Sequence, residues 1–290
     1  MQKFHLFINN PLLKKSLLAA IGIFALIGML FTAVFIGMQF EWFNVRGSSI
    51  ERNKFFAIAS STALEVPCVD KTKKTCEWNE TPEWEVIKNG LQKDADIIER
   101  VSKETGVSKR MIASVVIPEQ ARFFTSEREV FKRYFEPMKI LGSMSQFSLG
   151  VSGIKEKTAL EIEVNLANER SVFYPGPEYA KLIAYEPRVS DREKELFNRL
   201  TDEKNHYYSY LYTALYIKEI ESQWKANGFG ISENPEVVAT LFNIGFQGSN
   251  PNPNPKVGGT SINLGGKKYI YGDLAANFYR SEELADVFVE

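Results

Sequence analysis

The chain has 290 residues, a net charge of -1, and a composition that is 44% hydrophobic and 24% charged. This balance, with no stripe of Lys and Arg interleaved with aromatic residues, argues against nucleic-acid binding. The two histidines, His5 and His206, lie far apart in the sequence. Their spacing argues against a histidine-built metal site and against a Ser-His-Asp triad.

Residues 17–38 form an apolar run that is interrupted only by Thr32. At about 1.5 Å per residue such a helix would be about 33 Å long, enough to cross the hydrocarbon core of a bilayer. A cleaved signal peptide is the alternative, but the run is longer than a signal h-region and no small-x-small cleavage site ends it. We therefore expect a single, uncleaved transmembrane helix at residues 17–38.

The charges that flank this run predict its orientation. Lys3, Lys14 and Lys15 precede it, whereas Glu41 follows it. By the positive-inside rule, residues 1–16 are cytoplasmic and the rest of the chain lies on the extracytoplasmic side of the cytoplasmic membrane.

Residues 39–83 lack clear periodicity, and we interpret them as a juxtamembrane stalk. Cys68 and Cys76 lie in this stretch and flank the polar sequence V-D-K-T-K-K-T. In an oxidising compartment they would close a small disulfide loop, with two free thiols as the alternative. A lone pair of cysteines does not make a zinc site without further ligands.

From Trp84 onward the apolar spacing becomes helical. It predicts one amphipathic helix from Trp84 to near Gly106 and a second over residues 108–124. Capping boxes at residues 126–129 and 190–193 predict two more helix starts. Further helix signals are a cap at Thr201 or Asp202 that opens a long helix to Trp224, and the pair Asn234-Pro235.

The stretch T-S-I-N-L, Gly265-Gly266, K-K-Y-I-Y predicts a β-hairpin with a two-glycine turn, and a last helix is expected from about Asp273 to the end. The fold class that we predict is therefore mainly α, with one small β-hairpin, preceded by the transmembrane helix.

Glu119 is the carboxylate that stands out. It lies near the end of the helix expected over residues 108–124, with Ser108 as the N-cap and apolar residues on both sides. Pro118 is expected to kink or end the helix. Apolar surroundings disfavour the charged carboxylate and raise its pKa, which suits a general acid. The alternative is a helix-end glutamate that reaches water or pairs with Arg122.

Two later segments carry a resemblance to a known family. Residues 148–159 (S-L-G-V-S-G-I-K-E-K-T-A) resemble the S-x-G-x-x-Q-I…T-A motif of lytic transglycosylases and goose-type lysozymes, and residues 239–245 (A-T-L-F-N-I-G) resemble their A-x-x-Y-N-x-G motif. Residues 205–217 look like the family's helix beneath the cleft. With Glu119, these segments follow the family's order, and the resemblance covers about residues 84–290.

The sequence departs from the family pattern at two positions. Gly153 stands where the motif has glutamine, and Phe242 stands where it has tyrosine. The missing glutamine removes an amide that faces the cleft in relatives, and Gln120 or Gln146 could replace it. A divergent enzyme and a sugar-binding relative without activity are both consistent with these departures.

The resemblance implies a lysozyme-like domain that cleaves the MurNAc-GlcNAc bond of peptidoglycan strands without a cofactor or metal. Glu119 would first protonate the leaving oxygen and then act as base while the C6 hydroxyl attacks the anomeric carbon, which gives a 1,6-anhydro end. The alternatives are a lysozyme-type hydrolase, and a non-catalytic peptidoglycan-binding or scaffold protein on the same fold.

The resemblance also implies substrate-binding roles around Glu119. Ser148 and Gly150 would lie at a turn that faces it, Phe242 would line the cleft, and Asn243 would bind an N-acetyl group or orient the carboxylate. Tyrosines that could stack on sugar faces are Tyr207, Tyr208, Tyr269 and Tyr271, although helical spacing favours a core position for the first two. Other carboxylates, which we expect to be solvated, are Glu127, Glu129, Glu136, Glu161 and Glu163.

Overall fold

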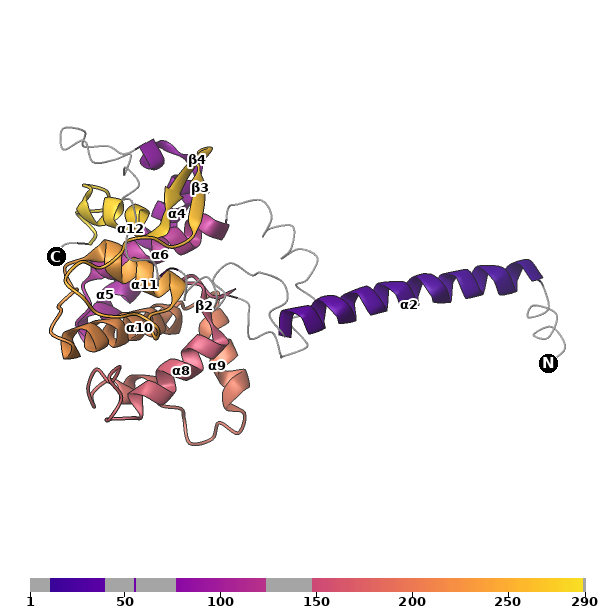
Figure 1. The fold of residues 1–290 in the computed structure, drawn as a ribbon, viewed down its shortest axis with the longest axis horizontal. Coiled ribbons are helices and arrows are strands. Elements are labelled where there is room, and N and C mark those ends of the chain that lie inside the picture. Colours follow the sequence, from indigo (N-terminus) through magenta and orange to yellow (C-terminus); the bar gives the residue numbers. More distant parts are fainter. Residues whose placement is uncertain (1–10, 40–54, 56–76, 124–147, 289–290) are drawn as a thin grey trace. The chain divides into compact units, whose positions relative to one another are not determined.

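The computed structural model describes residues 11–39, 55, 77–123 and 148–288, and the chain divides into two compact units, Met1–Glu51 and Arg52–Glu290. The first unit contains the helix α2 (Pro11–Gln39), drawn in indigo in Figure 1. A search of the described residues finds no helix with the length and hydropathy needed to cross a membrane.

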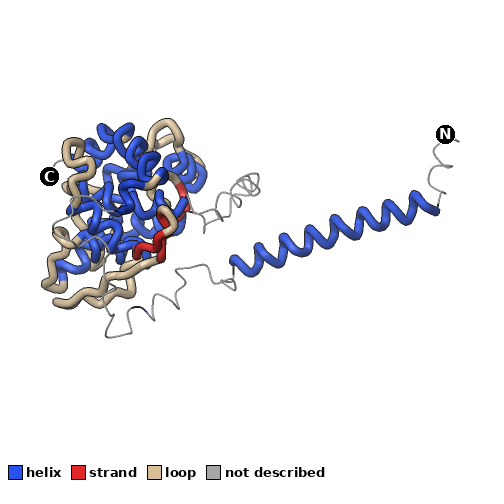
Figure 2. Tube along the Cα trace, turned by 90° about the horizontal axis from the view of Figure 1, so that it is seen from above, coloured by secondary structure: helices blue, strands red, loops and turns tan. Residues whose placement is uncertain are grey.

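The second unit is mainly helical, as the sequence predicted, and Figure 2 shows its few short strands among the helices. The α-helices that the structure describes there are α4 (Pro82–Lys93), α5 (Ala95–Thr105), α6 (Lys109–Phe123), α8 (Glu156–Leu166), α9 (Arg192–Thr201), α10 (Tyr207–Ala226), α11 (Pro235–Ile244) and α12 (Tyr271–Arg280). Two short 3-10 helices, η1 (Glu77–Glu80) and η3 (Ala180–Ile183), accompany them.

Two antiparallel strand pairs complete the described part of this unit. β3 (Ser261–Leu264) pairs with β4 (Lys267–Ile270), which confirms the predicted hairpin. Its turn residues Gly265 and Gly266 have φ values of 55° and 79°, which glycine adopts at little steric cost. β1 (Ser148–Leu149) pairs with β2 (Ile154–Lys155) and was not predicted, because two-residue strands are too short to show alternation.

Helix α10 lies in the centre of the second unit and packs against α5, α11, α8 and α9. Its side chains are buried almost all the way round, including Tyr210, Leu211, Ala214 and Leu215, none of which is exposed. A helix that is enclosed in this way belongs to the core. Tyr207 of α10 is also buried, so it does not offer its ring to a ligand.

Asp94 and His206 explain two boundaries that differ from the prediction. The helix expected from Trp84 to Gly106 is broken at Asp94, which ends α4 and begins α5. The Asp94 carboxylate contacts His206 Nδ1 at 2.6 Å and accepts a hydrogen bond from the Tyr210 hydroxyl at 3.0 Å. His206 is the N-cap of α10, so this helix begins at Tyr207 rather than at Thr201 or Asp202.

Of the two effects predicted for Pro118, a kink or an end of the helix, the end is excluded in α6. Pro118 lies inside the helix, which continues to Phe123. Ser108 Oγ accepts a hydrogen bond from the Met111 N–H at 3.1 Å, as expected of an N-cap. At the same end of α6, Arg110 donates hydrogen bonds to four backbone carbonyls at and beyond the end of α12: those of Phe278, Tyr279, Ser281 and Glu283.

Several predicted features lie outside the described residues. These are the cysteine loop with Cys68 and Cys76, the capping box at residues 126–129, the carboxylates Glu127, Glu129 and Glu136, and Gln146.

Candidate active site

Glu119 lies in the last turns of α6 and is 4% exposed. The residues just before it, Val115, Val116 and Ile117, have no exposed surface. Burial in apolar company removes water from the carboxylate, so its charge must be met by protein groups or by a proton. The predicted burial of Glu119 is therefore confirmed.

Arg122, about one turn further along α6, forms an ion pair with the Glu119 carboxylate. Its Nη1 donates to Glu119 Oε1 at 2.8 Å and to Oε2 at 3.0 Å. The side chain of Arg122 is 20% exposed and that of Glu119 is 5% exposed, so the pair is largely shielded from water. This is the pairing that the sequence left open as the alternative to a free general acid.

Asn243, in the last turn of α11, brings an amide to the same carboxylate. Its Nδ2 donates to Glu119 Oε1 at 3.4 Å, and its Oδ1 accepts a hydrogen bond from the Thr260 N–H at 2.8 Å. The second hydrogen bond fixes which way the amide faces, because an oxygen must point at the Thr260 N–H and the NH₂ group then points at Glu119. The predicted role of Asn243 in orienting Glu119 agrees with this geometry.

Gly153 provides the third side of the site. It lies between β1 and β2 with a φ of 67°, and a Cβ at this position would be 2.7 Å from Glu119 Oε2. Any side chain here would displace the carboxylate. Gly153, which stands where the family motif has glutamine, therefore has a structural role of its own, because the absence of a side chain allows the turn to approach Glu119.

Tyr271, the first residue of α12, closes the buried side of the site. It has no exposed surface, and its hydroxyl donates to the Val115 carbonyl at 2.8 Å. Burial, followed by the negative charge of Glu119, holds the pKa of Tyr271 well above its ordinary value of 10.0. Tyr271 is thus a neutral core residue near Glu119. It does not offer a face for sugar stacking, and neither does Tyr269, which is 4% exposed.

Of the other residues predicted to bind substrate, Gly150 faces away from Glu119, Phe242 is buried against an aromatic ring, and the side chain of Ser148 lies outside the described residues. A Cβ on Gly150 would meet the Leu200 carbonyl and the Ser209 side chain, so Gly150 faces α9 and α10 instead of Glu119. Phe242 is 8% exposed and packs edge-on against the Tyr216 ring at 5.3 Å between centroids. The backbone of Ser148 belongs to β1, and its side chain is outside the described set.

The residues that sequence analysis missed at this site are Thr260 and the contact made by Gly153. Thr260 acts through its backbone, which leaves no trace in a side-chain pattern. The i, i+3 spacing of Glu119 and Arg122 did carry a signal, because residues three apart share one face of a helix. Gln120, proposed as a replacement for the motif glutamine, donates to the Val151 carbonyl at 3.4 Å.

Comparisons with family models, with curated proteins and with solved structures find no match to the chain. The arrangement itself consists of a buried carboxylate, a guanidinium group on both of its oxygens, a fixed amide and a close glycine turn. Such a site can accept a proton, donate one after the ion pair opens, and hold a polar ligand through the amide.

Proposed function

We propose that this chain is a peptidoglycan lytic transglycosylase, anchored in the cytoplasmic membrane by residues 17–38 and acting on the extracytoplasmic side. The observation that carries the proposal is the convergence of three distant segments on one carboxylate: Glu119 from α6, Gly153 from the β1–β2 turn and Asn243 from α11. These are the segments on which the family resemblance rests, and it predicts that they share a cleft.

In the proposed reaction Glu119 carries out both proton transfers. Its carboxylic acid protonates the leaving glycosidic oxygen as the bond to the anomeric carbon breaks. The resulting carboxylate then takes the proton from the C6 hydroxyl as that oxygen bonds to the anomeric carbon. One proton is given and one is taken back, so Glu119 ends as it began.

Arg122 has a defined part in this cycle. In the ligand-free protein its Nη1 contacts both carboxylate oxygens of Glu119, so the acid step requires this contact to open and a leaving oxygen to take its place. After the first transfer the same guanidinium can stabilise the carboxylate that has formed. Arg122 therefore has to move away from the carboxylate in the acid step and can return to it afterwards.

The ion pair also favours a second candidate function. A carboxylate that stays paired with Arg122 would not protonate a leaving group, and the domain would then bind glycan strands without cleaving them. Binding to sacculi without any soluble product, in the wild type and in a Glu119→Gln variant alike, identifies this function.

The proposed reaction is tested by digesting purified sacculi with the full chain and weighing the released muropeptides by mass spectrometry. The proposal predicts 1,6-anhydro ends, which are lighter by one water than the reducing ends left by hydrolysis. Release of reducing ends alone would assign a lysozyme-type hydrolase instead.

A further inference from the structure

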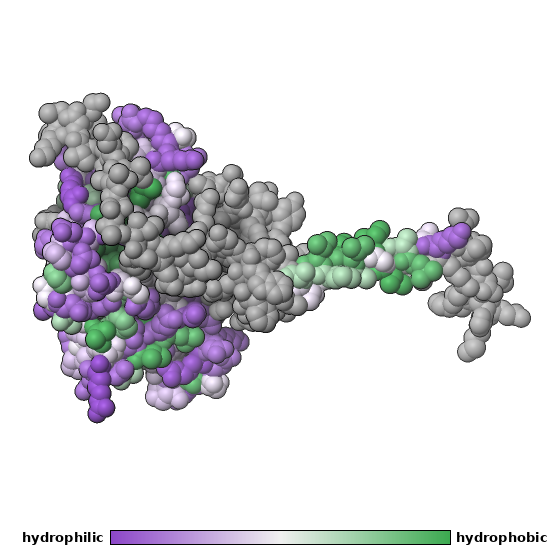
Figure 3. Space-filling view, viewed as in Figure 1, coloured by the Kyte–Doolittle hydropathy of each residue, from purple (hydrophilic) through white to green (hydrophobic). Residues whose placement is uncertain are grey.

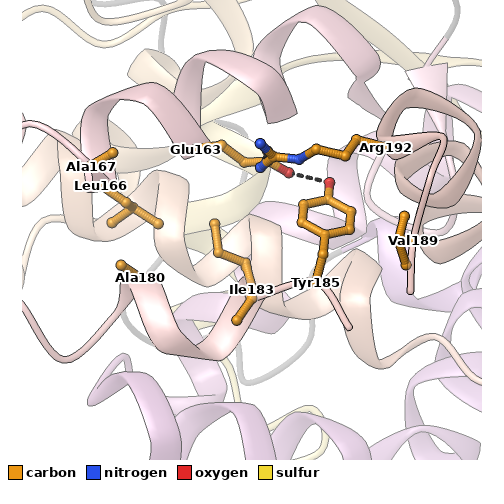
Figure 4. A pocket seen from close by; sticks show the side chains of 9 residues that line it. Glu163, Leu166, Ala167, Ala180, Ile183, Tyr185, Val189 and Arg192 are labelled. Atoms are coloured by element: carbon orange, nitrogen blue, oxygen red, sulfur yellow. Dashed lines mark hydrogen bonds and ion pairs between the residues drawn. The ribbon is translucent and has the colours of Figure 1, made fainter. Parts of the chain in front are cut away.

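A pocket of about 410 Å³ opens between α8, η3 and the start of α9 (Figure 4). This volume is in the range of small-ligand sites. The residues that line it are different from those that contact Glu119, so it is a separate site in the same unit. Its walls are mostly apolar, from Leu166, Ala167, Ala180 and Ile183 among others, and its polar groups are those of Glu163, Tyr185 and Arg192.

Glu163 was expected to be solvated, but its side chain is only 11% exposed and forms a fixed part of the wall. Its Oε1 accepts hydrogen bonds from the hydroxyls of Tyr185 and Tyr212, both at 2.6 Å, and its Oε2 accepts one from Arg192 Nη2 at 3.3 Å. Burial, followed by the hydrogen bond to Glu163, raises the pKa of Tyr185 to about 12, which keeps this hydroxyl a donor. With both oxygens engaged, Glu163 orients its neighbours and has little capacity left for a ligand.

Arg192 has N–H donors that no described residue occupies. Its contact with Glu163 is long for a charge-assisted hydrogen bond, and its side chain is 67% exposed. The guanidinium carbon lies 4.6 Å from the centre of the Tyr185 ring, and this cation–π contact helps to hold the group at the pocket. Among the described residues Arg192 has no other hydrogen-bond partner, so one edge of the guanidinium remains open.

Small apolar side chains surround the remainder of the pocket, and the apolar surface continues outside it. Leu160 and Val164 of α8 are 37% and 66% exposed, and with Ala167 they recur at i, i+4 and i+7 on one face. In Figure 3 a hydrophobic patch covers the part of the molecule where Figure 1 draws α8. A ligand longer than the pocket would therefore still contact apolar surface.

We propose that this pocket binds the C-terminal carboxylate of a short peptide with small apolar side chains. The carboxylate would take two parallel hydrogen bonds from the open edge of Arg192, and the methyl groups would lie against Ala167, Ala180 and Ile183. The charges of Arg192 and Arg199 are balanced by Glu163 and Glu195, so the preference for a carboxylate rests on the open edge of the Arg192 guanidinium. The inference rests on the proposed function for its source of peptide: stem peptides that end in D-alanine.

The test is a titration of the full chain in detergent with a stem pentapeptide ending in D-Ala-D-Ala, followed by NMR or calorimetry. Its C-terminal amide serves as the matched ligand, and we expect it to bind at least about tenfold more weakly. Arg192→Gln should weaken binding of the free acid by a similar factor. Arg188→Gln, at an exposed arginine of the same segment, should leave it unchanged. Equal binding of acid and amide, or full binding by Arg192→Gln, would overturn the proposal.

A second variant tests the apolar wall without touching the charge. Ala180→Phe fills part of the pocket and should reduce binding of the peptide acid while the melting temperature stays within a few degrees of the wild type. Unchanged affinity in this variant would contradict the location. Binding of the peptide by a chain that leaves sacculi intact would overturn only the proposed function. Cleavage of sacculi by a chain that does not bind the peptide would overturn only this inference.

Discussion

Glu119 and Gly153 depend on each other at the scale of single residues. The carboxylate oxygen occupies the space in which a Cβ on Gly153 would lie, and the φ of 67° at this position is unfavourable for any other residue. The site therefore requires glycine for two separate reasons, a steric one and a conformational one.

Gly153→Ala should lower sacculus cleavage by about 100-fold, because the methyl group pushes the carboxylate out of line. It should also cost about 1–2 kcal/mol in the free energy of unfolding, from the left-handed backbone. Gly106→Ala is the matched control: its φ is 71°, but no atom lies within 4 Å of the added Cβ. The control should lose similar stability and keep its activity. Equal activity in the two variants would contradict the contact with Glu119.

Glu219 is the second buried glutamate of the described domain. It lies in α10 with no exposed surface, and burial raises its pKa to about 9, against an ordinary value of 4.5, although Asn165 Nδ2 donates to Oε2 at 3.1 Å. The folded chain therefore keeps a proton that the unfolded chain loses as pH rises from 4.5 to 9. The stability associated with Glu219 is fully present below pH 4.5 and is lost as pH rises toward 9.

Glu219→Gln should remove this loss, because the amide does not ionise and still accepts a hydrogen bond from Asn165. The gain in the free energy of unfolding should grow by up to about 1.4 kcal/mol per pH unit across this window. Urea unfolding of both proteins at pH 5 and pH 8 measures it. If the free energies of unfolding of the two proteins differ by the same amount at both pH values, Glu219 ionises normally in the folded chain.

At the scale of elements, α6 is held by the end of α12. Arg110 of α6 is 5% exposed and donates to four backbone carbonyls, and its guanidinium lies 4.7 Å from the ring centre of Phe278. Carbonyls at a helix C-terminus lack intrahelical donors, and Arg110 supplies donors here alongside the N–H and hydroxyl of Ser281, which also donate to the Phe278 carbonyl. The arrangement fixes the start of the helix that carries Glu119.

Arg110→Met should therefore lower the free energy of unfolding by about 3 kcal/mol, since it removes a buried guanidinium that donates to four carbonyls. Thermal or urea unfolding measures the loss. Arg100→Met is the matched control, because Arg100 is largely exposed and pairs with Glu104 on its own helix. A loss no larger in the Arg110 variant than in the control would refute this role.

The sequence predicted elements where the information is local. The N-cap at Ser108, the pair Asn234-Pro235 and the turn Gly265-Gly266 all depend on adjacent residues, and each is found where expected. The break between α4 and α5 and the start of α10 at Tyr207 both involve the contacts of Asp94 with His206 and Tyr210. More than 100 residues separate Asp94 from these partners, so no local pattern reveals the contacts. The site follows the same rule: Glu119 and Asn243 were predicted, whereas the position of Gly153 required the fold.

At the scale of the whole molecule, the proposed anchor predicts how the chain partitions. Full-length protein should remain with membranes after alkaline carbonate extraction, because residues 17–38 would be buried in lipid. A double variant, Ile27→Arg and Leu30→Arg, should be released, since each charge at the centre of a span costs about 2.5–3.5 kcal/mol. Release of the wild type from membranes by carbonate, or retention of the double variant in the membrane fraction, would contradict the anchor.

The central claim is that one carboxylate, Glu119, performs the chemistry. Its most direct test compares the muropeptides released from sacculi by the wild type, by Glu119→Gln and by Glu219→Gln, which makes the same substitution at a buried glutamate outside the site. The proposed function predicts anhydro-muropeptides from the wild type and from Glu219→Gln, and none above background from Glu119→Gln. Undiminished release by Glu119→Gln would contradict it.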